Sequence, residues 1–195
     1  MRFINKSSFS HNPPTLILNE TKMEATKHDN LRLLFSLHSE NNEQVAFGEC
    51  AVQNDDGTQH LDISAIYVEG HINRPTQENP NKYHGLGQIL VFAAVRFGFQ
   101  HNIKNAQLMA VSGSEGFYLK MGFHRKAYGY ANRMLSQHSL ERSSHGKLNK
   151  NWINAFQDAS SRHTTAFIWP IWDGSISNLY PRLREDISRN WSIIE

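Results

Sequence analysis

The chain has 195 residues with 20 Lys+Arg against 18 Asp+Glu, so its formal net charge is +2. This balance argues against a nucleic-acid-binding protein, which would concentrate a larger basic excess on one element. The single cysteine cannot form an internal disulfide, and no Cys or His spacing is typical of a metal site, so we expect a fold that needs neither disulfide nor metal. The sequence has no apolar run of the roughly 18–20 residues of a membrane helix and no secretory signal. We therefore expect a cytoplasmic protein.

Three strands joined by polar turns are predicted in the first third of the chain. An irregular lead-in over residues 1–14 precedes a short β-rich run over 15–18. Apolar and polar residues then alternate over 31–38, and similar runs return over 45–52 and 60–68. Short connections of this kind predict an antiparallel meander. On the third strand, one face is expected to carry Leu61, Ile63, Ala65 and Tyr67.

The pattern becomes helical after a polar loop over residues 69–81. Apolar residues at 3.6-residue spacing predict a helix over 88–101, which is followed by a strand over 105–111. A short helix over 115–121 ends at a glycine, and another strand is expected over 123–130.

The C-terminal part is less regular. A helix is predicted over 150–160, a β-like run over 164–172 and a final helix over 179–191. We expect a core domain over 1–135 and an extension over 136–195 that packs on it and supplies the last strand.

The segment before the central helix has the composition of a phosphate-binding turn. It reads Lys82-Tyr83-His84-Gly85-Leu86-Gly87. Glycines let the backbone approach an anion closely, and the N–H groups and dipole of a helix N-terminus attract negative charge. The turn lacks the Lys-Ser or Lys-Thr of a Walker loop, and Leu90 replaces the third glycine of a dinucleotide fingerprint. An ordinary turn without a ligand is the alternative interpretation of so short a motif.

The order of these elements resembles the GCN5-related N-acetyltransferase superfamily over about residues 31–130. That family carries Gln/Arg-x-x-Gly-x-Gly/Ala before its central helix. Its preceding strand often reads Leu-Tyr-Val, compared with Ile66-Tyr67-Val68 here. Its later helix often ends in Phe-Tyr-x-Lys-x-Gly-Phe, which residues 117–123 match in full. The resemblance implies an α+β fold with a mixed, mostly antiparallel sheet and a central helix.

The resemblance also implies binding of acetyl-coenzyme A as acyl donor. Its pantetheine arm would run along the strand edge over 66–68, and its pyrophosphate would lie on the glycine turn. The implied coenzyme-binding residues are Ile66, Tyr67, Val68, Lys82, His84, Gly85, Leu86, Gly87 and Gln88.

Acetyl transfer to a primary amine by direct attack needs a base, an oxyanion donor and an acid. The family's tyrosine at the position of Tyr118 often protonates the leaving thiolate, so Tyr118 is the implied acid. Glu49 and Asp62 are the best candidates for the base, with Glu69 and His60 as further carboxylate and imidazole groups nearby in the sequence. A surface role is the alternative for each of them.

Three departures from the family pattern concern acceptor and coenzyme binding. Lys82 replaces the usual Gln or Arg, Val111 replaces a common Asn, and the loop over 69–81 is longer than usual. The missing Asn at position 111, together with the undetermined base, motivates an alternative, a non-catalytic coenzyme A-binding or protein-interaction module on the same fold. The acceptor stays open between a small molecule and a protein, and a homodimer is compatible with the sequence. Neither nucleic acid nor a membrane is an expected partner.

Overall fold

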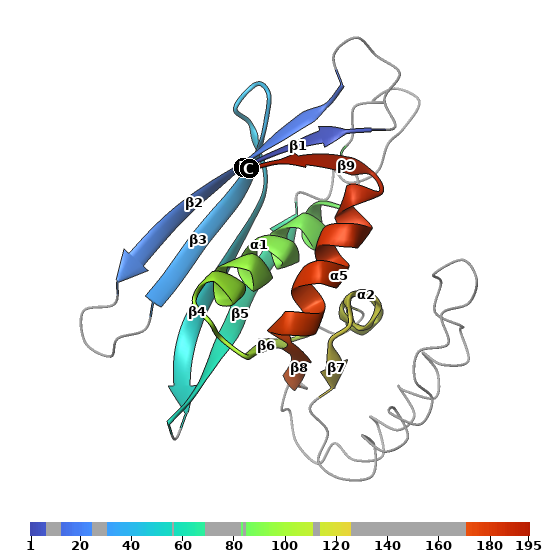
Figure 1. Cartoon of the computed structure of the whole chain (residues 1–195). Helices are drawn as coiled ribbons and strands as arrows, with labels where there is room; N and C mark the ends of the chain where they lie inside the picture. The colour runs from blue at the N-terminus through green and yellow to red at the C-terminus, as the bar shows by residue number, and fades with distance from the viewer. Residues whose placement is uncertain are drawn as a thin grey trace. The chain divides into compact units, whose positions relative to one another are not determined.

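The computed structural model describes residues 1–6, 13–24, 31–55, 57–68, 83, 85–110, 114–125 and 171–195 (Figure 1). The chain divides into two compact units. The first contains Met1–Ala106 and Ser175–Glu195, and the second contains Gln107–Gly174. The predicted boundary near residue 135 and the predicted helix over 150–160 lie outside the described residues.

The first unit is built on an antiparallel sheet with the strand order β5-β4-β3-β2-β1-β9. The predicted α+β class, with a mostly antiparallel sheet and a helix after the strands, is confirmed. The strands are β1 (Arg2–Asn5), β2 (Thr15–Glu24), β3 (Leu31–Ser39), β4 (Gln44–Asp55), β5 (Thr58–Val68) and β9 (Trp191–Ile194).

Two short strands, β1 and β9, were not predicted. The sequence indicated an irregular lead-in where β1 lies, and the final helix was expected to continue through Trp191, which instead begins β9. Both strands have only 4 residues, too few for a clear alternation. β1 pairs with β2 on one side and with β9 on the other. Long-range pairing therefore creates them, and it buries Phe3 completely.

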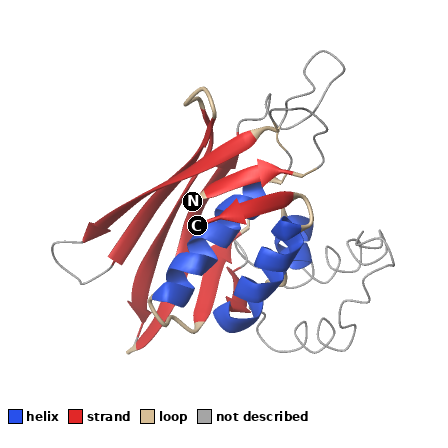
Figure 2. Ribbon diagram, turned by 45° about the horizontal axis from the view of Figure 1, so that its top comes forward, coloured by secondary structure: helices blue, strands red, loops and turns tan. Residues whose placement is uncertain are grey.

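Two helices lie side by side on one face of this sheet (Figures 1 and 2). Helix α1 (Leu86–Gln100) packs across β3, β4 and β5, and α5 (Ile176–Ser188) packs against α1. Helix α1 begins two residues earlier than predicted, because the fully buried Leu86 already belongs to its apolar side. Most of α1 is buried, since it is covered by the sheet on one side and by α5 on another.

The second unit contains α2 (Glu115–Met121), β7 (His124–Arg125) and β8 (Ile171–Ser175), which reaches the boundary between the units. Strands β7 and β8 pair antiparallel. The predicted helix over 115–121 is confirmed, and Gly122 ends it with a φ of 104°, the left-handed conformation expected of such a glycine. Strand β6 (Asn105–Met109) crosses the boundary between the units.

A bulge in β5 reverses the predicted side-chain alternation. Glu49 pairs with Ala65 but Cys50 pairs with Ile63, so Ser64 is the extra residue. The Ser64 hydroxyl group donates to the carbonyl oxygen of Glu49 at 3.3 Å. Beyond the bulge, Tyr67 lies on the face away from α1 and is 49% exposed, although it was predicted to share a face with buried Leu61 and Ile63. That prediction was wrong because an inserted residue shifts the alternation by one.

Candidate functional site

The N-terminus of α1 is shaped by a glycine in a left-handed conformation. Gly85 is the N-cap residue with φ 72° and ψ 20°, and its carbonyl oxygen accepts the first helical hydrogen bond from the N–H of Ile89 at 3.0 Å. A Cβ atom at Gly85 would meet only Gln88 Oε1, at 3.8 Å, so the turn is open beside it. A side chain larger than hydrogen would be strained there by the backbone conformation rather than by crowding.

This helix end fits an anion. No side chain among the described residues caps it, and its first turn carries no acidic residue. The first N–H groups of a helix lack intrahelical acceptors, so those of Leu86, Gly87 and Gln88 are directed at whatever lies beyond the helix end. Buried Leu86 fixes the first turn against the core. Lys82, His84 and the loop over 69–81 lie outside the described residues.

The C-terminal end of β5 carries the predicted pantetheine strand. Ile66 and Val68 pair with Gly48 and Ala46 of β4 and are half-buried on the side of α1. Tyr67 is directed to the other face, where its ring lies 5.1 Å from that of Phe47, centroid to centroid. One edge of β5 is therefore used by β4.

The two candidate bases lie on the same face of the sheet, away from α1. Glu49 alternates with Phe47 along β4, and Asp62 pairs with Ala51 on that face. Glu49 Oε1 lies 3.2 Å from Arg32 Nε, in a pair whose side chains are 30% and 53% exposed. Asp62 is half-buried, whereas His60 is almost completely buried on the same strand.

Cys50 lies on the opposite face of β4, where it is completely buried. Burial, together with the neighbouring Asp62, Glu20 and Glu49 carboxylates, raises the pKa of this thiol far above its usual range. A thiol that stays protonated is a poor nucleophile, so the sequence prediction of a packed cysteine is confirmed.

Tyr118 belongs to the second unit, whereas the candidates above belong to the first. Its ring makes edge contacts with Phe117 and Phe123, at centroid distances of 5.0 and 6.2 Å. Burial raises the pKa of its phenol above the ordinary value of 10.0. The group therefore keeps its proton at neutral pH, as an acid that protonates a leaving group must.

Sequence reasoning assigned no individual role to Tyr83, which contacts residues far from it in the chain. Its ring stacks with that of Trp191. Nothing in the local motif signals this contact, because Trp191 belongs to a strand that was not predicted.

The part of the chain described by the structure contains no cluster of three or more His, Cys, Asp or Glu residues able to hold a metal ion. No helix in the same described part is long and apolar enough to span a membrane.

Neither the scan against protein-family models nor the search of curated proteins finds a match. Among solved structures, the fold is similar to a protein of Pyrococcus furiosus named as an acetyl transferase, with 17% identity, a TM-score of 0.42, and coverage of 50% of this chain and 62% of that one, less than two thirds. It is also similar to an acetyltransferase of the GNAT family from Staphylococcus aureus (11% identity, TM-score 0.40, coverage 74% and 68%). A third similar structure is that of mutant forms of the spermidine/spermine N-acetyltransferase SpeG from Vibrio cholerae (12% identity, TM-score 0.45, coverage 80% and 70%). Because these TM-scores are below 0.5, the functional proposal rests on this chain's own residues.

Proposed function

We propose that the chain is an acetyltransferase of the GCN5-related N-acetyltransferase type, which moves an acetyl group from acetyl-coenzyme A to a primary amine. The observation that carries this proposal is Gly85, which begins α1 in a left-handed conformation, at a helix end that no side chain of the described residues caps. The glycine lies within a motif resembling that family's phosphate turn, and the second matching motif forms the predicted helix and terminal glycine.

In this proposal the coenzyme lies along two parts of the chain. Backbone N–H groups from Gly85 to Gln88 bind the pyrophosphate, with Lys82 and His84 contributing from the same turn. The pantetheine arm runs along β5 over Ile66–Val68. The bulge at Ser64 supports this arrangement, because a bulge bends a strand and this one lies just before Ile66–Val68.

The reaction proceeds by direct attack. The amine nitrogen bonds to the thioester carbonyl carbon, and a base takes the proton that the nitrogen loses. The backbone N–H of Val68 stabilises the oxyanion of the tetrahedral intermediate. The carbon–sulfur bond then breaks, and Tyr118 protonates the thiolate of coenzyme A. Glu49 and Asp62 are the candidate bases, and the Glu49 carboxylate lies 3.2 Å from Arg32 Nε.

The first test is calorimetry of the full chain with acetyl-coenzyme A. The second is measurement of thiol release with a panel of amines that includes polyamines, aminoglycosides, amino acids and lysine peptides. Binding together with amine-dependent thiol release is expected. Absence of binding would overturn the proposal. Binding without thiol release from any amine would favour a non-catalytic coenzyme A-binding module, an alternative that the occupied carboxylate of Glu49 also favours.

A further inference from the structure

Tyr83, two residues before Gly85, contacts two segments that are distant from it in the sequence. Its ring stacks on Trp191 at a centroid distance of 6.4 Å and an interplanar angle of 29°. Its hydroxyl group forms a hydrogen bond with the side chain of Ser39. Trp191 is buried at the start of β9, where it pairs with Asn5 of β1. Both contacts of Tyr83 are therefore to the sheet of the first unit, and both fix it from outside its own segment.

The surface that receives Tyr83 is itself well held. Ser39 is 5% exposed and ends β3, and its Oγ atom accepts a hydrogen bond from the N–H of Glu43 at 3.2 Å. Its own N–H donates to the carbonyl oxygen of Glu43 at 2.8 Å, and its carbonyl oxygen accepts from the N–H of Asn42 at 2.9 Å. These bonds close the β3–β4 turn around the serine.

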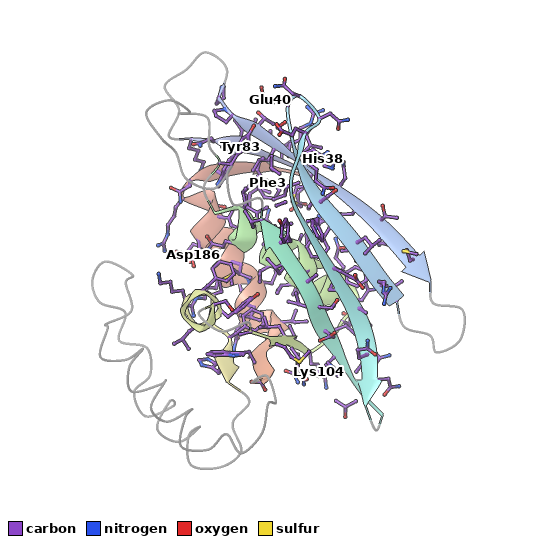
Figure 3. The ribbon with its side chains drawn as sticks, turned by 180° about the vertical axis from the view of Figure 1, so that it is seen from behind. Phe3, His38, Glu40, Tyr83, Lys104 and Asp186 are labelled. Carbon is purple, nitrogen blue, oxygen red and sulfur yellow. The ribbon has the colours of Figure 1, made fainter. Side chains whose placement is uncertain are left out.

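The electrostatic environment keeps the Tyr83 phenol neutral. Burial raises its pKa above the ordinary value of 10.0, and the carboxylates of Glu40 and Glu43 add to this effect. Tyr83 lies beside the turn that carries Glu40 (Figure 3). The neutral hydroxyl group can therefore keep its hydrogen bond with Ser39 throughout the physiological pH range.

We propose that Tyr83 is a positioning residue that holds the glycine turn in its anion-binding conformation, by docking on the β3–β4 turn and on β9. This inference rests on the proposed binding of coenzyme A. Glycines give the turn its shape but leave it many alternative conformations, and ordering them costs conformational entropy when a ligand binds. An aromatic anchor immediately before Gly85 reduces that cost before the ligand arrives. The C-terminal strand β9 thereby contributes to coenzyme binding although it lies outside both family-like motifs.

The test compares Tyr83→Ala and Tyr83→Phe with a matched control, Tyr180→Ala. Tyr180 also stacks on aromatic rings, with centroid distances of 4.5 Å to Phe99 and 5.6 Å to Phe92, but it lies on α5 away from the glycine turn. The readouts are the Kd of coenzyme A from calorimetry, the KM of acetyl-coenzyme A, the KM of the acceptor, kcat and Tm.

Tyr83→Ala is expected to raise the Kd of coenzyme A and the KM of acetyl-coenzyme A about tenfold, with kcat and the acceptor KM unchanged. Tyr83→Phe keeps the stack, so most of the affinity should be retained. Tyr180→Ala is expected to lower Tm without changing the Kd of coenzyme A.

Unchanged coenzyme affinity in a folded Tyr83→Ala variant would overturn the inference and leave the proposed function standing. A Tyr83→Ala variant that lowers kcat and Tm together, as a general loss of packing would, also contradicts a positioning role. If the wild-type chain binds no coenzyme A, the proposed function fails and the inference falls with it.

Discussion

The guanidinium group of Arg96 on α1 lies 2.7 Å from the carboxylate of Glu20 on β2. The two side chains are only 14% and 24% exposed, so water screens the pair less than it screens a surface ion pair. The Nε atom of Arg96 is also buried, and it has no hydrogen-bond partner in the described structure. The pair fixes the central helix to a strand that lies beyond the three strands against which it packs.

Removal of this carboxylate should therefore be costly. Glu20→Ala leaves the Arg96 charge partly buried without its partner, so the free energy of unfolding is expected to fall by about 1–3 kcal/mol in urea denaturation. The control is Glu185→Ala, which breaks an exposed pair with Arg189 on α5 at 3.0 Å and should cost about 0.5 kcal/mol or less. Equal losses in the two variants would contradict a special role for the Arg96–Glu20 pair.

The close packing of α5 on α1 depends on Gly98. A Cβ atom there would lie 2.6 Å from Ile176 Cδ1 and 3.2 Å from Leu61 Cδ2. Gly98→Ala should lower the free energy of unfolding by about 1–3 kcal/mol, because the overpacking outweighs the gain of about 1 kcal/mol from helix propensity. Ile176→Val removes the Cδ1 atom, so the double variant should be more stable than the sum of the two single effects predicts. Strict additivity in this cycle would show that removal of the Ile176 Cδ1 atom does not relieve the overpacking caused by Gly98→Ala.

Most of the longer helices and strands in the described residues could be predicted because their signals are local. The alternation of β3 and the 3.6-residue spacing of α1 follow directly from which residues are buried. The helix over 115–121 was predicted with its observed bounds because Gly122 marks its end. The sequence placed Gly85 in the turn before an apolar helix, and Gly85 is the N-cap residue of α1. Its role in binding the coenzyme stays a prediction.

The remaining features depend on contacts between distant segments. The β5 bulge is defined only by its pairing with β4, so alternation alone put Tyr67 on the wrong face. Strands β1 and β9 form because they pair with each other. The contact between Tyr83 and Trp191 depends in turn on β9, and no local pattern at residue 83 could indicate it.

His101 should make the fold sensitive to acid. It ends α1 with its ring 4.6 Å from that of Phe97, centroid to centroid, and its Nε2 atom is buried with no hydrogen-bond partner in the described structure. Burial, and then the Lys22 ammonium group, lower its pKa below the usual 6.5. A lowered pKa contributes stability that is present above the unfolded value and is lost as the pH falls through the folded value.

We expect Tm to fall as the pH drops from about 7 to about 5, and His101→Gln to flatten that dependence because it removes the titrating group. Lys22→Gln removes only the second cause and should flatten the dependence less. The measurement is thermal unfolding at half-unit pH intervals. A wild-type profile that is matched by His101→Gln throughout this range would exclude His101 as the source.

Tyr118 is expected to carry the acid step of the proposed reaction. Tyr118→Phe keeps the ring contacts with Phe117 and Phe123 but removes the proton donor, so kcat should fall about 100-fold with little change in Tm. Burial raises the pKa of this phenol, so its ionisation should not reduce the wild-type rate below about pH 10. Phe117→Leu, which alters the neighbouring ring and keeps the phenol, is the control. Unchanged turnover in Tyr118→Phe would remove the acid assignment and leave the enzyme class intact.

The conformation of Gly85 can be separated from its role in binding by comparison with another glycine of the same kind. Gly57 in the turn between β4 and β5 has a φ of 81°, compared with 72° at Gly85, and a Cβ atom there would meet nothing within 4 Å. Gly57→Ala and Gly85→Ala should each lower the free energy of unfolding by about 1–2 kcal/mol, because both force an L side chain into the left-handed region.

Only Gly85→Ala should also weaken the binding of coenzyme A, by about tenfold or more in Kd, because relaxation of the strain moves the N–H groups that bind the pyrophosphate. Urea denaturation and calorimetry on the same preparations provide both quantities. If both variants lose stability equally and both bind coenzyme A as the wild-type chain does, the coenzyme's phosphates do not lie on the N-terminus of α1. If Gly57→Ala weakens binding as much as Gly85→Ala, the loss reflects global destabilisation and the glycine turn has no specific role.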